Sequence, residues 1–282
     1  MIYNELKSTP SMVSFYTRAI LPKRLDKQAN SLPEIGFELK AFKAKERHVR
    51  AYEKLCSFEA SDKLTSTYVH MLIFPLMMEV MLDKSFPFPL MGMVHIANTI
   101  TQHKPIGIAE TMDIRCSFGE LKNHNKGKVI ELLSEIHVNG EVVWEESAEM
   151  LVRLPVKGEK PLAPRQEKLQ SKVVDWEMGS SLGIRYALIS GDSNPIHLIT
   201  PTAKLLGFKK HIAHGMWTKS RCLAQMQDQL PEAYRVKVDF KLPVFLPTSV
   251  AYYQEQQGEQ TVFEVRSSDG RKPHLCGKLI SI

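Results

Sequence analysis

The stretch HIAHGMWTKSRCLAQMQDQL, residues 211–230, decides the fold of the second half of this chain. Met216, Leu223 and Met226 recur on one side at helical spacing, so the stretch predicts one long helix. A helix that is apolar on most sides must be wrapped by other elements, and a strongly curved antiparallel sheet can do this.

The residues after this helix predict such a sheet. Residues 234–256 alternate as strands do, and Pro243 and Pro247 break the alternation. Residues 261–282 predict a β-hairpin that turns at Asp269-Gly270. The second half therefore reads as one long helix followed by an antiparallel meander.

The first half repeats this order of elements. Residues 66–82 predict a helix, residues 95–118 predict broken strands, and residues 128–154 predict a hairpin that turns at Asn139-Gly140. We infer an internal duplication, in which two copies of one unit lie in tandem.

The two halves can be matched by position. Aligning the helices places His70 before the first helix, as His214 precedes the second. Met71 is then the counterpart of Gly215, so the first helix start lacks the glycine that lets a ligand approach the backbone closely.

Residues 154–172 are rich in proline, lysine and glutamine and show no sustained apolar period, so they are the best candidate linker. The predicted domains are residues 1–157 and residues 158–282. The fold class is α+β, with each repeat a curved antiparallel sheet around a long helix.

Composition excludes several classes of protein. The chain has 282 residues, 43% of them hydrophobic and 24% charged, which is typical of a soluble globular protein. The beginning lacks the pattern of a secretory signal, and no apolar stretch is long enough to span a bilayer. The cysteines are scattered without C-x-x-C spacing, which predicts reduced thiols in a cytoplasmic protein. They are Cys56, Cys116, Cys222 and Cys276.

The net charge of +6 favours anionic partners in general. The densest basic run is residues 39–50, which we interpret as a solvated face. As a more specific alternative, this basic run could contact a phosphorylated cofactor tail or an acidic carrier protein. Nucleic acid ranks third, because no known binding module accompanies the charges.

Residues 185–201, RYALISGDSNPIHLITP, place an acid, an amide and an imidazole on a short, stiff loop. Asp192 and His197 flank a rigid Asn-Pro step, so both side chains can converge on one point. Together they can take and return a proton near neutral pH, and Asn194 could hold either group in place. The same residues also suit a structural turn, and residue types alone do not separate the two interpretations.

Gly215 opens the long helix downstream, where unpaired N–H groups present partial positive charge. Such a site suits an oxyanion that forms on a carbonyl oxygen. An ordinary helix start is the alternative. Loop and helix start together would supply an acid/base pair beside an oxyanion site.

Residues 186–197, YALISGDSNPIH, followed by residues 205–221, LLGFKKHIAHGMWTKSR, closely resemble the MaoC-like acyl dehydratases and the (R)-specific enoyl-CoA hydratases. These families have the hot-dog fold. The resemblance is strong over the second half; over the first it is architectural, matching double hot-dog proteins whose leading repeat is degenerate.

The resemblance implies that Asp192 and His197 bind a catalytic water molecule and that Asn194 supports them. It also implies that the Gly215 amide binds the thioester oxygen. The implied reaction is the reversible syn addition of water to a trans-2-enoyl thioester, which gives an (R)-3-hydroxyacyl thioester. No cofactor or metal is implied beyond the substrate's carrier, coenzyme A or acyl carrier protein. The first repeat would shape the tunnel for the substrate and would not react.

Several alternatives remain beside this hypothesis. A non-catalytic acyl-thioester binding protein or a hot-dog thioesterase could share the fold. Residues 179–183, GSSLG, match a serine-esterase motif around Ser181, but the chain lacks the strand–helix alternation of that fold. His211 and His214 could join Asp192 and His197 in a metal site, which we rank low. We expect neither a nucleic-acid nor a membrane partner, and a homodimer of double hot-dog units is an open prediction.

Overall fold

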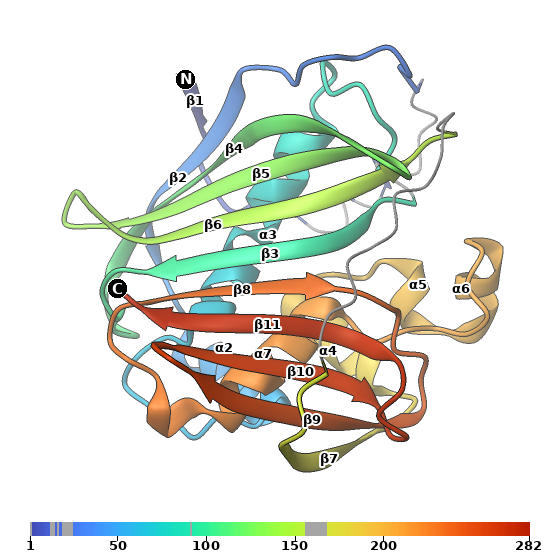
Figure 1. Cartoon of the computed structure of the whole chain (residues 1–282). Coiled ribbons are helices and arrows are strands. Elements are labelled where there is room, and N and C mark those ends of the chain that lie inside the picture. Colours follow the sequence, from blue (N-terminus) through green and yellow to red (C-terminus); the bar gives the residue numbers. More distant parts are fainter. Residues whose placement is uncertain (1, 12–14, 16, 19–24, 91, 156–167) are drawn as a thin grey trace.

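Eleven strands form one continuous sheet in the computed structural model, which describes residues 2–11, 15, 17, 18, 25–90, 92–155 and 168–282 (Figure 1). The strands of the first half are β1 (Ile2–Glu5), β2 (Ile35–Lys43), β3 (Val94–Gln102), β4 (Thr111–His124), β5 (Gly127–Val138) and β6 (Glu141–Arg153). Those of the second half are β7 (Lys172–Met178), β8 (Tyr234–Phe240), β9 (Thr248–Gln257), β10 (Gln260–Ser267) and β11 (Pro273–Ser281).

The order of strands across the sheet shows the duplication. It runs β1-β2-β4-β5-β6-β3-β8-β11-β10-β9-β7. With β1 set aside, each half therefore has the same internal order: β2 and β7 lie at the outer edges of the two halves, and β3 and β8 lie at the edges where the halves meet. The strands of each repeat pair antiparallel, as predicted, and β1 adds to β2 in parallel.

The two repeats join edge to edge through β3 and β8. These strands pair antiparallel from Ala97 opposite Asp239 to Gln102 opposite Tyr234. The duplication was predicted from the sequence, but this junction was not. Because β3 and β8 complete each other's hydrogen bonding, neither repeat leaves this edge open.

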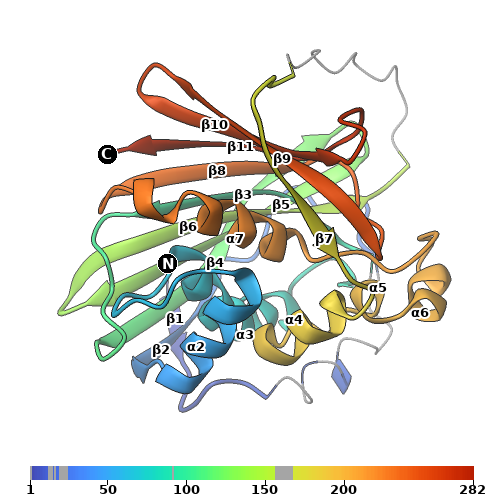
Figure 2. The same ribbon diagram turned by 90° about the horizontal axis from the view of Figure 1, so that it is seen from below.

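The helices lie on one face of the sheet (Figures 1 and 2). They are α2 (Glu46–Cys56), α3 (Ser66–Leu82), α4 (Leu182–Ser190), α5 (Pro195–Leu198), α6 (Thr200–Leu205) and α7 (Gly215–Gln225), followed by a short 3-10 turn (Gln227–Gln229). The two long predicted helices are α3 and α7. Most side chains of α3 are buried, because the curved sheet covers one side of it and other helices cover the rest.

The start of α3 corrects one prediction. The helix begins at Ser66, so His70 lies inside it and does not precede it. Met71 is therefore not at a helix start, and by α-helical geometry its N–H points at the carbonyl of Thr67. The first repeat thus lacks an open amide at the position that corresponds to Gly215, for a reason that goes beyond the absent glycine.

Both predicted hairpin turns are present. Asn139 and Gly140 connect β5 to β6 with φ angles of 52° and 82°, and Gly270 turns β10 into β11 at φ 69°. These are left-handed conformations, which asparagine and glycine adopt at the least cost.

A polar chain crosses the core between the repeats. Lys219 of α7 is fully buried, and its Nζ donates to Oδ1 of Asn98 on β3 at 2.5 Å. The Asn98 amide donates to Oε1 of Glu146 at 2.5 Å, and Nδ1 of His70 lies 2.7 Å from the same oxygen. Burial lowers the pKa of Lys219 to about 7, against the opposing effect of Glu146. Because each member depends on the next for its hydrogen bonds, this chain fixes α7 against the first repeat.

The predicted linker falls largely outside the described residues, which resume at Lys168. The boundary between residues 157 and 158 therefore stays a prediction. The basic run at residues 39–50 lies at the surface, where Lys40 pairs with Glu38 and Arg50 pairs with Glu53.

All four cysteines are buried and none forms a disulfide. Among the described residues, no helix has the length and apolar character needed to cross a membrane.

Candidate active site

The GDSNPIH loop is built from residues with identifiable local roles. Gly191 ends α4 in the left-handed conformation (φ 77°), and its N–H donates to the carbonyl of Ala187 at 2.9 Å. Asn194 caps α5, because its Oδ1 accepts from the N–H of Ile196 at 3.3 Å. Pro195 takes the first helical position, where its fixed φ suits the helix. These features hold Asp192 and His197 on opposite sides of one short turn.

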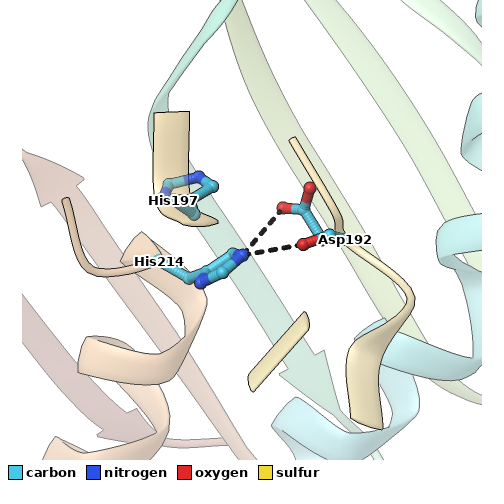
Figure 3. Close-up of side chains that lie close together, drawn as sticks. All are labelled: Asp192, His197 and His214. Atoms are coloured by element: carbon cyan, nitrogen blue, oxygen red, sulfur yellow. Dashed lines mark hydrogen bonds and ion pairs between the residues drawn. The ribbon is translucent and has the colours of Figure 1, made fainter. Parts of the chain in front are cut away.

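The predicted pair converges, and a third side chain joins it. Asp192, His197 and His214 each offer one donor atom, and these atoms all lie within 4.8 Å of one another (Figure 3). Both histidines are buried, whereas the Asp192 side chain is 27% exposed. The two imidazole rings of the site are therefore shielded from solvent, whereas solvent can reach the carboxylate.

His197 has a defined tautomer in this environment. Its Nδ1 lies 2.8 Å from the backbone carbonyl of Ile212, which can accept but not donate. The proton of a neutral ring is therefore on Nδ1, which leaves the lone pair on Nε2. Burial lowers the pKa of His197, although Asp192 and the Ile212 carbonyl act in the opposite direction. A neutral His197 near neutral pH can thus accept a proton at Nε2.

His214 is the site residue that the sequence did not assign. Its Nε2 donates to the backbone carbonyl of Asp192 at 2.9 Å and lies 3.8 Å from Oδ2 of the same residue (Figure 3). Its ring stacks on His197 with the centroids 3.7 Å apart. Burial and the neighbouring His197 lower the pKa of His214 to about 3. His214 is the N-cap residue of α7, but its side chain makes no capping hydrogen bond to the helix.

Asn194 supports the pair through the loop. Its side chain is used in capping α5, while its backbone N–H donates to Oδ1 of Asp192 at 3.2 Å. Asn194 therefore orients the carboxylate by placing a backbone donor, while its side-chain oxygen caps α5.

Gly215 is the first residue of α7, so its N–H belongs to the helix turn that intrahelical carbonyls do not reach. A Cβ at this position would lie 2.8 Å from the ring of Phe240 on β8. Close packing of this ring explains the glycine. The residues flanking the helix start are held by backbone bonds, from Ala213 to Val244 and from Ile212 to Ile196.

The serine-esterase motif GSSLG and the candidate metal ligand His211 have structural roles outside the site. Within GSSLG, Gly183 packs its backbone against the carbonyl of His197, while Ser181 precedes the first residue of α4. His211 does not join the site, because Nδ1 bonds Thr200 and Nε2 bonds the carbonyl of Ser180.

The geometry of Asp192, His197 and His214 must also be tested against a metal ion. One nitrogen of each histidine already donates to a backbone carbonyl, Nδ1 of His197 to Ile212 and Nε2 of His214 to Asp192. The Asp192 carboxylate and Nε2 of His197 are not used in these two backbone bonds. A catalytic zinc site ordinarily has three protein ligands. This arrangement suits a water molecule better, and the expected absence of a metal stays a prediction.

Comparisons with known proteins agree with this architecture. The MaoC like domain matches residues 158–276. The chain is 32% identical over 231 residues to 3-hydroxyacyl-thioester dehydratase X of Mycobacterium tuberculosis, covering 81% of this chain and 82% of that protein. The crystal structure of HtdX from the same organism superimposes with a TM-score of 0.79 at 27% identity, over 88% of this chain and all of that one.

A more distant structure shows the same fold. A MaoC-like dehydratase from Phytophthora capsici superimposes with a TM-score of 0.70 at 16% identity, over 89% of this chain and 96% of that one. With its two matched units of curved sheet and long helix, the chain is a double hot-dog protein, as the sequence predicted. It belongs to the MaoC-like dehydratase family.

Proposed function

We propose that this protein is a hydro-lyase that adds water reversibly to a trans-2-enoyl thioester and yields an (R)-3-hydroxyacyl thioester. The observation that carries the proposal is the proximity of Asp192 and His197, whose polar atoms lie within 4.8 Å of each other and of His214, the residue before α7. Its relative in Mycobacterium tuberculosis is named a 3-hydroxyacyl-thioester dehydratase, which supports the same reaction class for this chain.

The site supplies each group that hydration needs. Asp192 accepts one hydrogen of the water molecule and fixes its orientation, because the carboxylate is itself held by the Asn194 N–H. Nε2 of His197 removes the other proton as the oxygen attacks C3. The proton then passes to C2 on the same face of the substrate, which gives syn addition without net consumption of protons.

The enolate charge that develops between these steps needs a donor. The Gly215 N–H lies at the positive end of α7, where the helix supplies no acceptor of its own. We assign the thioester oxygen to this amide. Losing one such donor ordinarily costs roughly 10²–10³ in rate.

The first repeat would shape the site without reacting. Its long helix α3 presents no open amide near Met71, and His70 is hydrogen-bonded to Glu146. We propose that it contributes to the tunnel for the acyl chain or the pantetheine arm. No cofactor is required beyond the carrier of the substrate, coenzyme A or acyl carrier protein.

Product analysis with crotonyl-CoA tests the proposal. Hydration removes the ultraviolet absorbance of the enoyl thioester without releasing thiol, and chiral analysis of the product should give the (R)-3-hydroxy acid. Release of thiol would instead support a thioesterase. Binding of crotonyl-CoA with no change in either signal would support the non-catalytic alternative, and both outcomes would overturn the hydratase proposal.

A further inference from the structure

A concave site lies away from the GDSNPIH loop, between helices of both repeats. It is a cavity of about 380 Å³ between α2, β7, α4 and α7. Lys54 of α2, Arg185 of α4 and Arg221 of α7 line it, together with Trp176 and Trp217. Three cations from three separate helices therefore face one hollow.

These cations have no anionic partner among the described residues. None of the three makes an ion pair there, whereas Arg50 and Lys172, for example, each pair with a nearby carboxylate. Arg221 is partly buried, with its guanidinium 5.1 Å from the centroid of the Trp176 ring. Burial lowers the pKa of Arg221. A half-buried guanidinium without a counter-charge is costly, so the arrangement favours a bound anion.

Two carboxylates border the same cavity but do not neutralise it. Successive side chains of a strand point to opposite faces, so Asp175 and Glu177 of β7 point away from the face on which Trp176 meets Arg221. Both already have partners on that other face. Asp175 lies 2.6 Å from Nζ of Lys172, and Glu177 accepts from the hydroxyl of Ser249 at 2.5 Å.

We propose that this cavity, the α2–α4–α7 pocket, binds the phosphate groups of a phosphorylated small molecule. The two arginines can each pair with phosphate oxygens through two parallel hydrogen bonds, and Lys54 adds a point charge. Three cations suit a group that carries two or more negative charges better than a single carboxylate does.

The phosphate groups have two candidate sources. One is the nucleotide end of coenzyme A on the substrate, and this source rests on the hydratase function proposed above. Arg185 lies five residues before the end of α4 at Ser190, about 7.5 Å along the helix axis, and Asp192 follows two residues after that end; a pantetheine arm can span this separation. The other source is a free phosphorylated metabolite that occupies the pocket independently of the substrate.

Binding of inorganic pyrophosphate tests the shared chemistry without any catalytic assay. Isothermal titration with the full chain should detect one site, and Arg185→Gln and Lys54→Gln should each weaken binding by at least about tenfold. Both residues are exposed at the rim, so these variants should fold, whereas Arg221→Gln removes a partly buried group. Arg271→Gln, on the exposed turn between β10 and β11, is the matched control and should bind as the wild type does.

Absence of pyrophosphate binding, or equal binding by the pocket variants and the control, would overturn the proposal. This readout does not depend on turnover, so it can fail or succeed separately from the hydratase function.

Kinetics then distinguish the two sources. If the pocket holds the nucleotide of coenzyme A, Arg185→Gln should raise KM for crotonyl-CoA about tenfold relative to KM for crotonyl-pantetheine, which lacks the nucleotide. If a free metabolite is the ligand, the ratio of the two KM values should match the wild type while pyrophosphate binding is lost. Either result, together with the binding data, supports a phosphate pocket.

Discussion

The backbone carbonyl oxygen of His197 lies 1.9 Å from the position that a Cβ on Gly183 would occupy. Helix α4 therefore approaches α5 so closely that only glycine fits at this point. Because the obstructing atom is backbone, the contact cannot be relieved by rotating a side chain. We expect Gly183→Ala to displace His197, to lower kcat/KM by about tenfold or more, and to lower the melting temperature.

Gly179 provides the control within the same GSSLG motif. A Cβ there meets no atom within 4 Å, so Gly179→Ala should behave as the wild type in both measurements. Equal effects of the two substitutions would show that the close approach to His197 is not what makes Gly183 necessary.

His214 should make the protein sensitive to acid. An unfolded histidine takes up a proton near pH ~6.5, whereas burial lowers the pKa of His214 to about 3. Between these values the unfolded chain binds the extra proton, so the free energy of unfolding falls as pH falls, by up to about 1.4 kcal/mol per pH unit from this residue.

His214→Gln should reduce this loss, because glutamine places an amide nitrogen near the position of Nε2 and does not titrate. Urea unfolding at pH 7, 5 and 4 measures the effect, with His103→Gln, at a partly exposed histidine, as the control. If the His214 variant lost as much stability between pH 7 and pH 4 as the wild type does, the assignment of a buried neutral ring would be contradicted.

The buried contact between Lys219 and Asn98 should stabilise the junction of the repeats. Lys219→Met leaves Oδ1 of Asn98 without its donor and removes a cation near buried Glu146. We expect a loss of about 3–5 kcal/mol in the free energy of unfolding, measured by urea denaturation. Lys278→Met, at an exposed position on β11, should cost little. A similar cost for both would mean that the polar chain contributes nothing specific.

The pH dependence of the reaction should reflect His197. Burial lowers the pKa of His197, and the neutral ring is the form that accepts the proton. The acid limb of kcat/KM should therefore lie below the ordinary histidine value of ~6.5. An acid limb at or above that value would mean that His197 is not the base or is not desolvated during catalysis.

Local patterns were sufficient to predict much of this structure. The alternation in residues 234–256 and the Asn139-Gly140 turn determine their strands and hairpin with little help from the rest of the chain. The stiff Asn-Pro step likewise allowed the convergence of Asp192 and His197 to be predicted, because caps at Gly191 and Asn194 act over a few residues.

Features that depend on distant residues could not be predicted in the same way. Lys219 and Asn98 are 121 residues apart, and nothing in either local sequence indicates the other. The helical period of residues 66–82 predicted a helix but did not show where that helix begins. The prediction that Met71 lies at the helix start was therefore wrong, because α3 begins at Ser66. His214 gave no signal beyond its place before Gly215, since its contact with Asp192 joins the residues that follow α4 to those that precede α7, 22 positions along the chain.

Hydration of crotonyl-CoA by His197→Asn tests the proposed roles at the site most directly. Asparagine places its amide nitrogen near the position of Nδ1, so the bond to the Ile212 carbonyl can persist while the lone pair at Nε2 is removed. We predict a fall in kcat of about 10²–10⁴ with the melting temperature nearly unchanged. A folded variant that turns over crotonyl-CoA at the wild-type rate would contradict the assignment of His197 as the base.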